Sequence, residues 1–422
     1  MIKCIDNDIL IKEFLDRLND RNNLFNDKEY EVVKNICDKV MKEKDEFLFE
    51  CIKKYDNKEF KKENFIIDKK QLELIYNNLE QDKKDLITSA YKRIYDFHNN
   101  IKINSWHLIN DNCTLGHRYI PLDTVAIYVP GGKAIYPSSV LMNAIPAIVA
   151  KVNTIVMATP TYNEMVLACA HKLGIECVYL MGGAHAISAF AYGTKLVKRV
   201  DKIVGPGNIY VTLAKKYVYG SVGIDSIAGP SEIVILANEN ANPRYIAADM
   251  LAQAEHDEKA LAILIASSDS LINEVKESLK QLYDESQRKN ILDVSLKENS
   301  CIIKVNKIQD GIELINLIAP EHLELMIEDY EYYLDKIRNV GAIFIGDYSS
   351  EVIGDYMAGP SHVLPTCGSA RFSSCLSVED FMKRSSIIKI DKTTFDELKN
   401  DAIKFGEIEK LDMHVKSVKI RK

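Results

Sequence analysis

Short apolar runs alternate with helix-like segments through the chain after Asp123, and this alternation constrains the fold more than any other feature. In the first part of that region the predicted strands are 124–129, 154–158, 176–180 and 201–204, and the predicted helices between them are 138–150, 164–173 and 184–192. Strands that alternate with helices favour a parallel sheet covered by helices. We therefore predict an α/β fold.

The same alternation starts again near Glu232, which predicts a second βα module. Its predicted strands are 232–236, 261–265, 301–305 and 341–345, and its predicted helices are 243–254, 270–289 and 310–318. Two long amphipathic helices, 28–55 and 69–99, precede both modules, and a polar connection containing Trp106 follows them. We expect these helices to add to the second module. From about Ser377 the chain is predicted to be a charged, largely helical tail.

Length and charge narrow the classes of function. The chain of 422 residues is too long for one compact core. Its net charge of -7 does not favour a nucleic-acid partner. No window has the length and apolar character of a membrane span, and the charged N-terminus does not look like a secretion signal. The nine cysteines include no Cys-x-x-Cys pair, so we expect a reducing, cytoplasmic location.

Glycine turns follow several predicted strands, where ligands bind in parallel α/β sheets. The turns are Pro130-Gly131-Gly132, Gly182-Gly183-Ala184, Gly205-Pro206-Gly207-Asn208 and Ala228-Gly229-Pro230-Ser231. None is a G-x-G-x-x-G fingerprint, and each alone fits ordinary turn chemistry. Three within one module favour a site for a small molecule that carries phosphate.

Polar side chains with catalytic or metal-binding chemistry gather in the second module and the tail. Gln253 and His256 share a face if their helix continues, and they offer an amide oxygen and a ring nitrogen as ligands. Glu321 and His322 follow Pro320, which should push Ala319 toward extended geometry and present the pair on a turn. Adjacent Glu and His can divide the handling of a water and an alcohol proton. Each pattern alone also fits exposed polar surface.

Further candidates are Asp355 and His362, in a loop rich in Gly and Ser after the strand that ends at Ile345, and Glu409 and His414 in the tail. An Asp in such a loop is commonly a turn or cap residue, and tails are commonly disordered. Taken together, the candidate ligands Gln253, His256, Asp355 and His414 contain no thiolate. That composition favours an open, substrate-binding metal site over a closed structural zinc site.

These stretches occur in the order found in the histidinol dehydrogenases, and from about Tyr128 to Arg421 the chain resembles that family. The carrying segments are 128–132, 200–208, 228–232, 253–256, 319–323, 346–348, 354–356 and 362–366. The resemblance implies oxidation of L-histidinol, through L-histidinal, to L-histidine with two NAD, as the last step of histidine biosynthesis. It also implies two incomplete Rossmann-like modules.

The family pattern assigns roles to individual residues. Glu321 would activate the water and His322 would take a proton in each oxidation. Zinc, one per subunit, would be held by Gln253, His256, Asp355 and His414. The residues implied to bind substrate are Ser231, Gln253, His256, His322, Asp355, His362, Glu409 and His414. NAD would contact Tyr128, Asn208 and position 185, where His185 replaces the family's usual Gln, and an imidazole can still make one such hydrogen bond.

The resemblance also implies a homodimer with shared active sites, in which each tail crosses to the partner. The expected domains are an N-terminal helical segment (1–25), a main domain with the metal and catalytic residues (26–122 and 232–375), an NAD-binding domain (123–231) and the tail (376–422). Small molecules are the expected ligands, with neither nucleic acid nor membrane as a partner.

Other functions fit parts of the same pattern. A metal-dependent hydrolase would use the metal and a Glu base, but it would leave the glycine turns without a role. A non-catalytic binding protein would be expected to have lost some of the six candidate catalytic and ligand residues. Glu321, His322 and the four ligands are all present. A dehydrogenase of another amino alcohol would lack a reason for Glu409, which matches a position that contacts imidazole.

Overall fold

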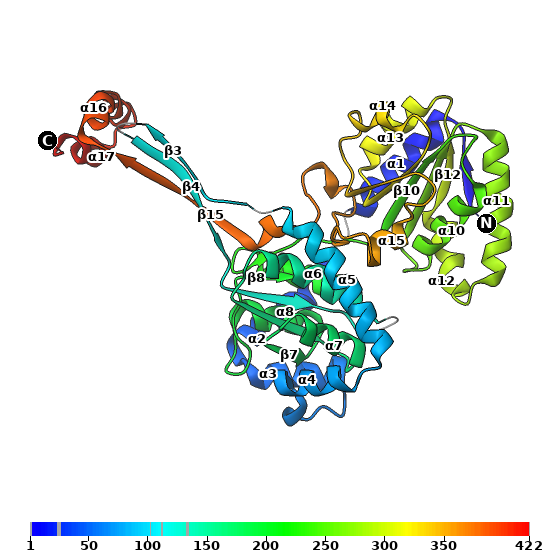
Figure 1. The fold of residues 1–422 in the computed structure, drawn as a ribbon, viewed down its shortest axis with the longest axis horizontal. Coiled ribbons are helices and arrows are strands. Elements are labelled where there is room, and N and C mark those ends of the chain that lie inside the picture. The colour runs from blue at the N-terminus through cyan, green and yellow to red at the C-terminus, as the bar shows by residue number, and fades with distance from the viewer. Residues whose placement is uncertain (1, 23–26, 102, 111–112, 132–134, 422) are drawn as a thin grey trace. The chain divides into compact units, whose positions relative to one another are not determined.

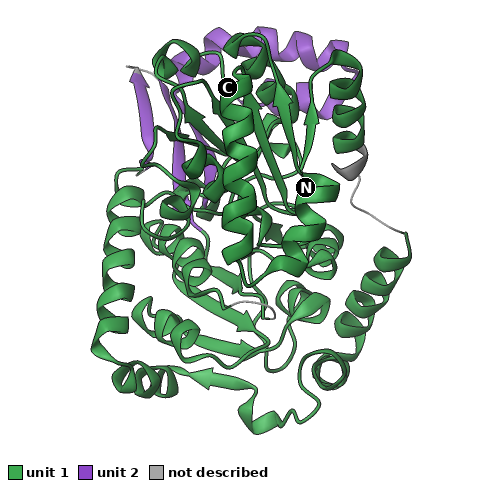
Figure 2. Cartoon of the chain, turned by 90° about the vertical axis from the view of Figure 1, so that its right-hand side faces the viewer, with its two compact units in different colours: residues 1–101, 122–381 green, residues 102–121, 382–422 purple. Residues whose placement is uncertain are grey.

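The structure is a computed structural model, and it describes residues 2–22, 27–101, 103–110, 113–131 and 135–421. The chain divides into two compact units, residues 1–101 with 122–381 (unit 1) and residues 102–121 with 382–422 (unit 2), coloured green and purple in Figure 2. Unit 1 contains two six-stranded sheets with helices packed on them (Figure 1). The α/β class with two parallel-sheet modules is therefore confirmed.

The first sheet has the strand order β2-β7-β6-β5-β8-β9. Its strands are β2 (Ile66–Asp68), β5 (Thr124–Tyr128), β6 (Thr154–Thr159), β7 (Cys177–Leu180), β8 (Lys202–Val204) and β9 (Gly223–Ile224). Only β2 is antiparallel to its neighbour. The chain moves from β5 outward to β7 and returns to β8 on the other side of β5. The point where the strand order reverses therefore lies between β5 and β8, where ligands bind in such sheets.

Four helices alternate with these strands. Three lie close to their predicted bounds: α6 (Pro137–Val149), α7 (Glu164–Lys172) and α8 (Gly183–Tyr192). The fourth, α9 (Ile209–Val218), was not predicted. Two of them begin at an asparagine cap. The side chains of Asn163 and Asn208 each accept hydrogen bonds from two amides of the following turn. These caps satisfy amides that have no partner inside the helix.

The helices of the N-terminal part differ from the prediction in their packing. They are α2 (Asp27–Glu43), α3 (Asp45–Cys51), a π-helical turn (Ile52–Asp56), a 3-10 turn (Lys62–Asn64), α4 (Lys69–Asn78) and α5 (Gln81–Asn99). Contrary to our assignment of 26–122 to the second module, α2 packs on α8 and α9, α4 on α7, and α5 on α6. Val33 and Val40 of α2 share a core with Phe190 of α8. An amphipathic pattern shows that a helix has an apolar face, but not which sheet that face covers.

The second sheet is parallel throughout, with the order β1-β12-β11-β10-β13-β14. Its strands are β1 (Lys3–Ile5), β10 (Glu232–Ala237), β11 (Leu261–Ala266), β12 (Cys301–Lys304), β13 (His322–Met326) and β14 (Ala342–Ile345). The sequence reading missed β1 and β13. Although β13 carries His322 and Glu324, all five of its residues are buried.

Helices cover both faces of the second sheet, each face with its own apolar core. They are α1 (Asp8–Asn22), α10 (Pro243–Ala254), α11 (Asp269–Glu285), α12 (Lys289–Val294), a π-helical turn (Ser295–Asn299), α13 (Ile308–Ile318), α14 (Tyr330–Leu334) and α15 (Glu351–Tyr356). Two 3-10 turns, Ser369–Arg371 and Val378–Phe381, follow near the end of unit 1. The N-terminal segment thus contributes β1 to the second sheet and α1, which packs against α13.

Unit 2 is a three-stranded antiparallel sheet with two helices. The strands are β3 (Trp106–Asn110), β4 (Cys113–Pro121) and β15 (Met382–Ile390), in the order β15-β4-β3, and the helices are α16 (Lys392–Ile408) and α17 (Asp412–Lys419). The expectation of a polar connection around Trp106 and a largely helical tail therefore missed a sheet. β3 and β4 form a local hairpin, but β15 pairs with β4 across more than 260 residues of sequence, so no local turn signal reveals that pairing.

Candidate functional site

The predicted catalytic pair lies at the amino end of the second sheet. His322 is the first residue of β13 and pairs in register with Ile233, next to Glu232 at the start of β10. Ligands usually bind at the carboxyl ends of parallel strands, so the site lies at the opposite end. Side chains reach this end of the sheet from the helices, because α10 follows β10 and runs back toward the beginning of that strand. Its last turn carries Gln253.

Three carbonyl and carboxylate groups surround His322. Its Nδ1 lies 3.0 Å from the backbone oxygen of Glu232, 3.4 Å from Oε1 of Glu351 and 3.7 Å from Oε2 of Glu321. A carbonyl oxygen only accepts, so Nδ1 carries the proton and Nε2 carries the lone pair. Burial, together with the smaller effects of the neighbouring His256 and His362, lowers the pKa of His322 to about 3. The imidazole is therefore neutral near pH 7 and has a nitrogen ready to accept a proton.

Glu321 is held by the neighbouring strand. Its Oε2 accepts a hydrogen bond from the backbone N–H of Glu232 at 3.0 Å, and the residue is 6% exposed. The predicted helix end before Pro320 is confirmed, since α13 ends at Ile318. Ala319 is not extended as predicted: it adopts the left-handed conformation, with φ 54°, and closes the helix by donating to the oxygen of Ile315. His322, expected on a turn, begins a strand.

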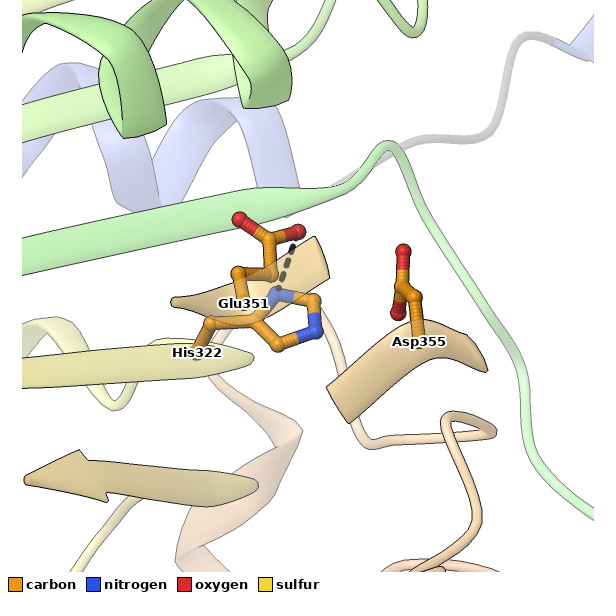
Figure 3. A group of neighbouring side chains, drawn as sticks. All are labelled: His322, Glu351 and Asp355. Atoms are coloured by element: carbon orange, nitrogen blue, oxygen red, sulfur yellow. Dashed lines mark ion pairs between the residues drawn. The ribbon is translucent and has the colours of Figure 1, made fainter. Parts of the chain in front are cut away.

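Asp355 lies in the short helix α15, not in the loop where we predicted it. Ligand atoms of His322, Glu351 and Asp355 all lie within 4.8 Å of one another, and Figure 3 shows the two carboxylates near the imidazole ring. Burial raises the pKa of Asp355 to about 7. A bound cation would favour the ionised form of this carboxyl. The group is therefore suited to a cation.

Gln253 and His256 reach the same region from α10. The helix ends at Ala254, and the N–H of His256 donates to the oxygen of Gln253 at 3.3 Å, so His256 lies just beyond the helix. Gln253 is fully buried. His256 is close enough to His322 and His362 to lower the pKa of each. Helices α10 and α15 are in contact, so the elements that carry Gln253, His256 and Asp355 lie next to one another.

Sequence reasoning missed a set of buried acids behind these residues. Asp249 is four residues before Gln253 on α10, Glu351 is four before Asp355 on α15, and Glu324 is two after His322 on β13. Each spacing places the acid on the same face as the site residue. Oε1 of Glu324 accepts the N–H of Glu351 at 2.9 Å, and burial raises the pKa of Asp249 to about 6 and that of Glu324 to about 8. The spacings were visible in the sequence, but the burial was not.

Two predicted substrate contacts lie in loops near this site. His362 is in a loop, as predicted, and its Nδ1 donates to the backbone oxygen of Asp355 at 3.0 Å. Burial lowers the pKa of His362 to about 4, which leaves a neutral ring with a lone pair on Nε2. Ser231 precedes β10 and is partly buried. The adjacent loop is fixed by a 2.6 Å hydrogen bond from the N–H of Gly229 to the hydroxyl of Thr366.

The predicted cofactor residues lie at the carboxyl edge of the first sheet. Tyr128 ends β5, and Asn208 caps the helix after β8, so the two flank the point where the strand order reverses. The hydroxyl of Tyr128 accepts the N–H of Gly183 at 3.1 Å. His185 lies in the first turn of α8, and its Nε2 is 2.8 Å from Oδ2 of Asp56. Gly132 of the first predicted turn lies outside the described residues.

The glycines at this edge have steric roles. A Cβ on Gly205 would lie 2.1 Å from the backbone oxygen of Tyr128, and Gly205 has φ +118°. Gly183 also has positive φ, +57°. Close approach of the backbone therefore requires glycine at position 205, and positive φ favours it at position 183.

Glu409 and His414 lie in unit 2. Glu409 caps the end of α16, His414 is in α17, and Lys410 between them has φ 58°. Both side chains are exposed within the chain. Glu409 and His414 thus lie on either side of a turn between two helices, and the chain is helical at His414 rather than extended.

Comparison with known proteins points to one family. A family model described as histidinol dehydrogenase matches residues 19–422. The chain is 44% identical to the histidinol dehydrogenase of Aquifex aeolicus over 98% of this chain and 97% of the relative. It is 45% identical to that of Halalkalibacterium halodurans over 94% of each. The crystal structure of histidinol dehydrogenase from Elizabethkingia anophelis superimposes with a TM-score of 0.92 at 31% identity, covering 100% of this chain and 98% of that one.

The match extends over both sheets and unit 2, and it includes every candidate residue discussed above. Among the described residues, no helix has the length and apolar character that crossing a bilayer requires. The chain belongs to the histidinol dehydrogenase family of oxidoreductases.

Proposed function

We propose that the protein oxidises L-histidinol to L-histidine through L-histidinal, with zinc and two NAD per turnover, as the last step of histidine biosynthesis. The observation that carries the proposal is the surroundings of His322: a buried, neutral imidazole whose tautomer is fixed, with the carboxyl groups of Glu351 and Glu321 3.4 and 3.7 Å from Nδ1. Each oxidation removes a hydride from carbon and a proton from oxygen. A neutral base of fixed orientation is what the proton requires.

His322 accepts the proton at Nε2, because Nδ1 is committed to the backbone oxygen of Glu232. When NAD is bound, its nicotinamide ring supplies the acceptor for the hydride. Glu351 lies 3.4 Å from Nδ1, and although burial raises the pKa of this carboxyl well above its usual range, its ionised form would stabilise the imidazolium that forms. The same base serves both oxidations, since each starts from an O–H group, first the alcohol and then the aldehyde hydrate.

Glu321 activates the water that hydrates the aldehyde. Its carboxylate is aimed by the amide of Glu232, which also fixes its distance from His322. The two residues are therefore separate groups with a common anchor on β10. This arrangement supports a division of labour in which only the second half-reaction depends on Glu321.

Gln253, His256 and Asp355 would hold the zinc from within unit 1, and His414 would complete the set. The donors fit the ion, since they are an amide oxygen, a carboxylate and neutral imidazoles. Several buried carboxyl groups nearby also favour a cation. When bound, zinc would supply a Lewis acid that holds the amine and imidazole nitrogens of the substrate. Ser231, His362 and Glu409 would supply the remaining substrate contacts.

NAD would bind at the carboxyl edge of the first sheet, against Tyr128, His185 and Asn208. The support is their position around the reversal of strand order, together with the glycine turns. All nine cysteines are free thiols, which suits the reducing cytoplasm we propose as the location.

We further propose a homodimer in which unit 2 of each subunit completes the partner's site. Apolar side chains of unit 2 are exposed in the single chain, among them Ile109, Ile388, Phe405 and Met413. Apolar side chains exposed in this number on a small unit are consistent with an association surface. Glu409 and His414, on the same unit, would then reach the site of the other subunit.

The experiment is turnover of L-histidinol with NAD, followed by NADH absorbance, before and after prolonged chelation. We expect two NADH per histidinol, loss of turnover on chelation with the fold intact by circular dichroism, and recovery on addition of Zn²⁺. Full activity in metal-free protein would contradict the ligand assignment. Hydrolysis without NADH would favour a metal-dependent hydrolase, and preference for another amino alcohol would contradict the substrate.

A further inference from the structure

A buried aspartate from the N-terminal helices is bonded to the glycine turn of the proposed cofactor site. Asp56 ends the π-helical turn after α3, more than 120 residues before that turn. Its Oδ2 accepts the N–H of Gly182 at 2.9 Å and is 2.8 Å from Nε2 of His185. One carboxylate oxygen thus holds both the turn and the first helical residues that follow it.

The environment makes these bonds strong. The side chains of His185 and Asp56 are only 2% and 8% exposed, so water competes little for them. A carboxylate at the start of α8 is also favoured by the partial positive charge of a helix N-terminus. The position is tightly fitted, because a Cβ on Gly182 would lie 3.1 Å from Oδ1 of Asp56 and 2.8 Å from Pro160.

The bond to Asp56 also fixes which ring nitrogen of His185 donates. The carboxylate accepts, so Nε2 of His185 donates and the lone pair of the neutral ring is on Nδ1. The family's usual glutamine carries a donor and an acceptor on one amide. In this chain the bond to Asp56 defines Nε2 as the ring nitrogen that donates.

The same turn is held from its other side by Tyr128, whose hydroxyl accepts the N–H of Gly183. Two of the three proposed cofactor contacts, Tyr128 and His185, are therefore tied to one two-residue turn. Displacing that turn would move both contacts together.

We propose that Asp56 is a positioning residue of the dinucleotide site, which fixes the Gly182–Gly183 turn and the tautomer of His185. This inference rests on the proposed use of NAD, and it adds a residue that the sequence pattern did not identify. Asp56 acts through Gly182 and His185, so its loss should weaken cofactor binding and spare the site on the second sheet.

Asp45 provides a matched control at the other end of the same helix. It also comes from the N-terminal helices, and its carboxylate accepts the N–H of Lys195 at 3.0 Å and the hydroxyl of Thr194 at 2.5 Å, just after α8 ends. An alanine at either position removes a carboxylate that fixes a loop. Only Asp56 holds the cofactor turn.

The test compares Asp56→Ala, Asp56→Asn and Asp45→Ala by the KM for NAD, the KM for histidinol, kcat and thermal midpoint, with NAD binding measured by calorimetry. Loss of a hydrogen bond to a charged group should raise the KM and Kd for NAD in Asp56→Ala by about tenfold or more. The histidinol KM should change little. Asp56→Asn should stay within about threefold, because its amide oxygen can accept both N–H groups. Asp45→Ala should lower the thermal midpoint without changing the KM for NAD.

The outcomes separate this inference from the proposed function. If the unsubstituted protein oxidises histidinol with NAD but Asp56→Ala binds NAD normally, the inference is overturned and the function stands. Equal losses of NAD affinity in Asp56→Ala and Asp45→Ala, or in Asp56→Ala and Asp56→Asn, would also overturn it. If the unsubstituted protein does not bind NAD at all, both are overturned.

Discussion

At the scale of single residues, Glu321 and His322 are neighbours in the chain with different surroundings. The imidazole of His322 is oriented by a backbone carbonyl, whereas the carboxylate of Glu321 is oriented by a backbone amide. A donor fixes one group and an acceptor fixes the other, so the two cannot exchange roles. The structure thus supports separate substitutions at each position.

We predict that Glu321→Gln impairs the conversion of histidinal to histidine far more than the oxidation of histidinol. The amide retains an oxygen to accept the Glu232 N–H but cannot take a proton from water. His322→Asn should slow both oxidations by about 10²–10⁴-fold, the usual contribution of a general base. Rates of NADH formation from each substrate separate the two half-reactions. Equal losses in both for Glu321→Gln would count against the division.

The buried His98 should make the free energy of unfolding depend on pH. It is 1% exposed on α5, neither ring nitrogen has a hydrogen-bond partner among the described residues, and burial lowers its pKa to about 4. The unfolded chain takes up a proton near the ordinary pKa of 6.5, whereas the folded protein resists it. The stabilisation is therefore complete above pH 6.5 and is lost as the pH falls toward 4, by up to about 3 kcal/mol.

The check is the free energy of unfolding by urea at several pH values between 4 and 8, compared between the natural chain and His98→Leu. On acidification, the free energy of unfolding should fall less in the variant than in the natural chain. Above pH 7, it should change with pH in the same way in both proteins. The same slope in both proteins would show that His98 is not the titrating group.

At the scale of secondary structure, sequence reasoning succeeded where the pattern is local. The helix at Pro243–Ala254 and strands such as β5 and β11 have continuous apolar runs bounded by turn residues, so their positions were predictable. β13 was not, because His322 and Glu324 make a buried strand look polar. A strand of this kind breaks the local rule, since its buried polar groups are stabilised by partners from other elements.

The candidate site divides in the same way. Residues within recognisable motifs, such as His322 and Asp355, could be named from the sequence. Asp56, Glu324 and Glu351 could not, although the last two lie at helical or strand spacing from a named residue. Their significance depends on burial and on contacts across elements, and neither is encoded by spacing alone. For the same reason, the sequence did not predict which sheet the N-terminal helices cover.

At the scale of the whole molecule, the division of the proposed ligands between the two units predicts shared active sites. Gln253, His256 and Asp355 belong to unit 1, and His414 belongs to unit 2. Unit 2 exposes apolar side chains that an isolated chain would leave in water. A two-fold dimer makes an exchange of such units reciprocal, so each subunit would give and receive one His414.

We predict that two inactive variants complement each other when they are unfolded and refolded together. One carries Glu321→Gln with His322→Asn, and the other carries His414→Asn. In a hybrid dimer with shared sites, one site combines both lesions and the other is intact. Random pairing makes half of the dimers hybrids, so roughly a quarter of the unsubstituted activity should return. If His414 served its own subunit, every site in the mixture would keep a lesion. Hybrid dimers that form, as seen by differential tagging, but remain inactive would therefore rule out the exchange.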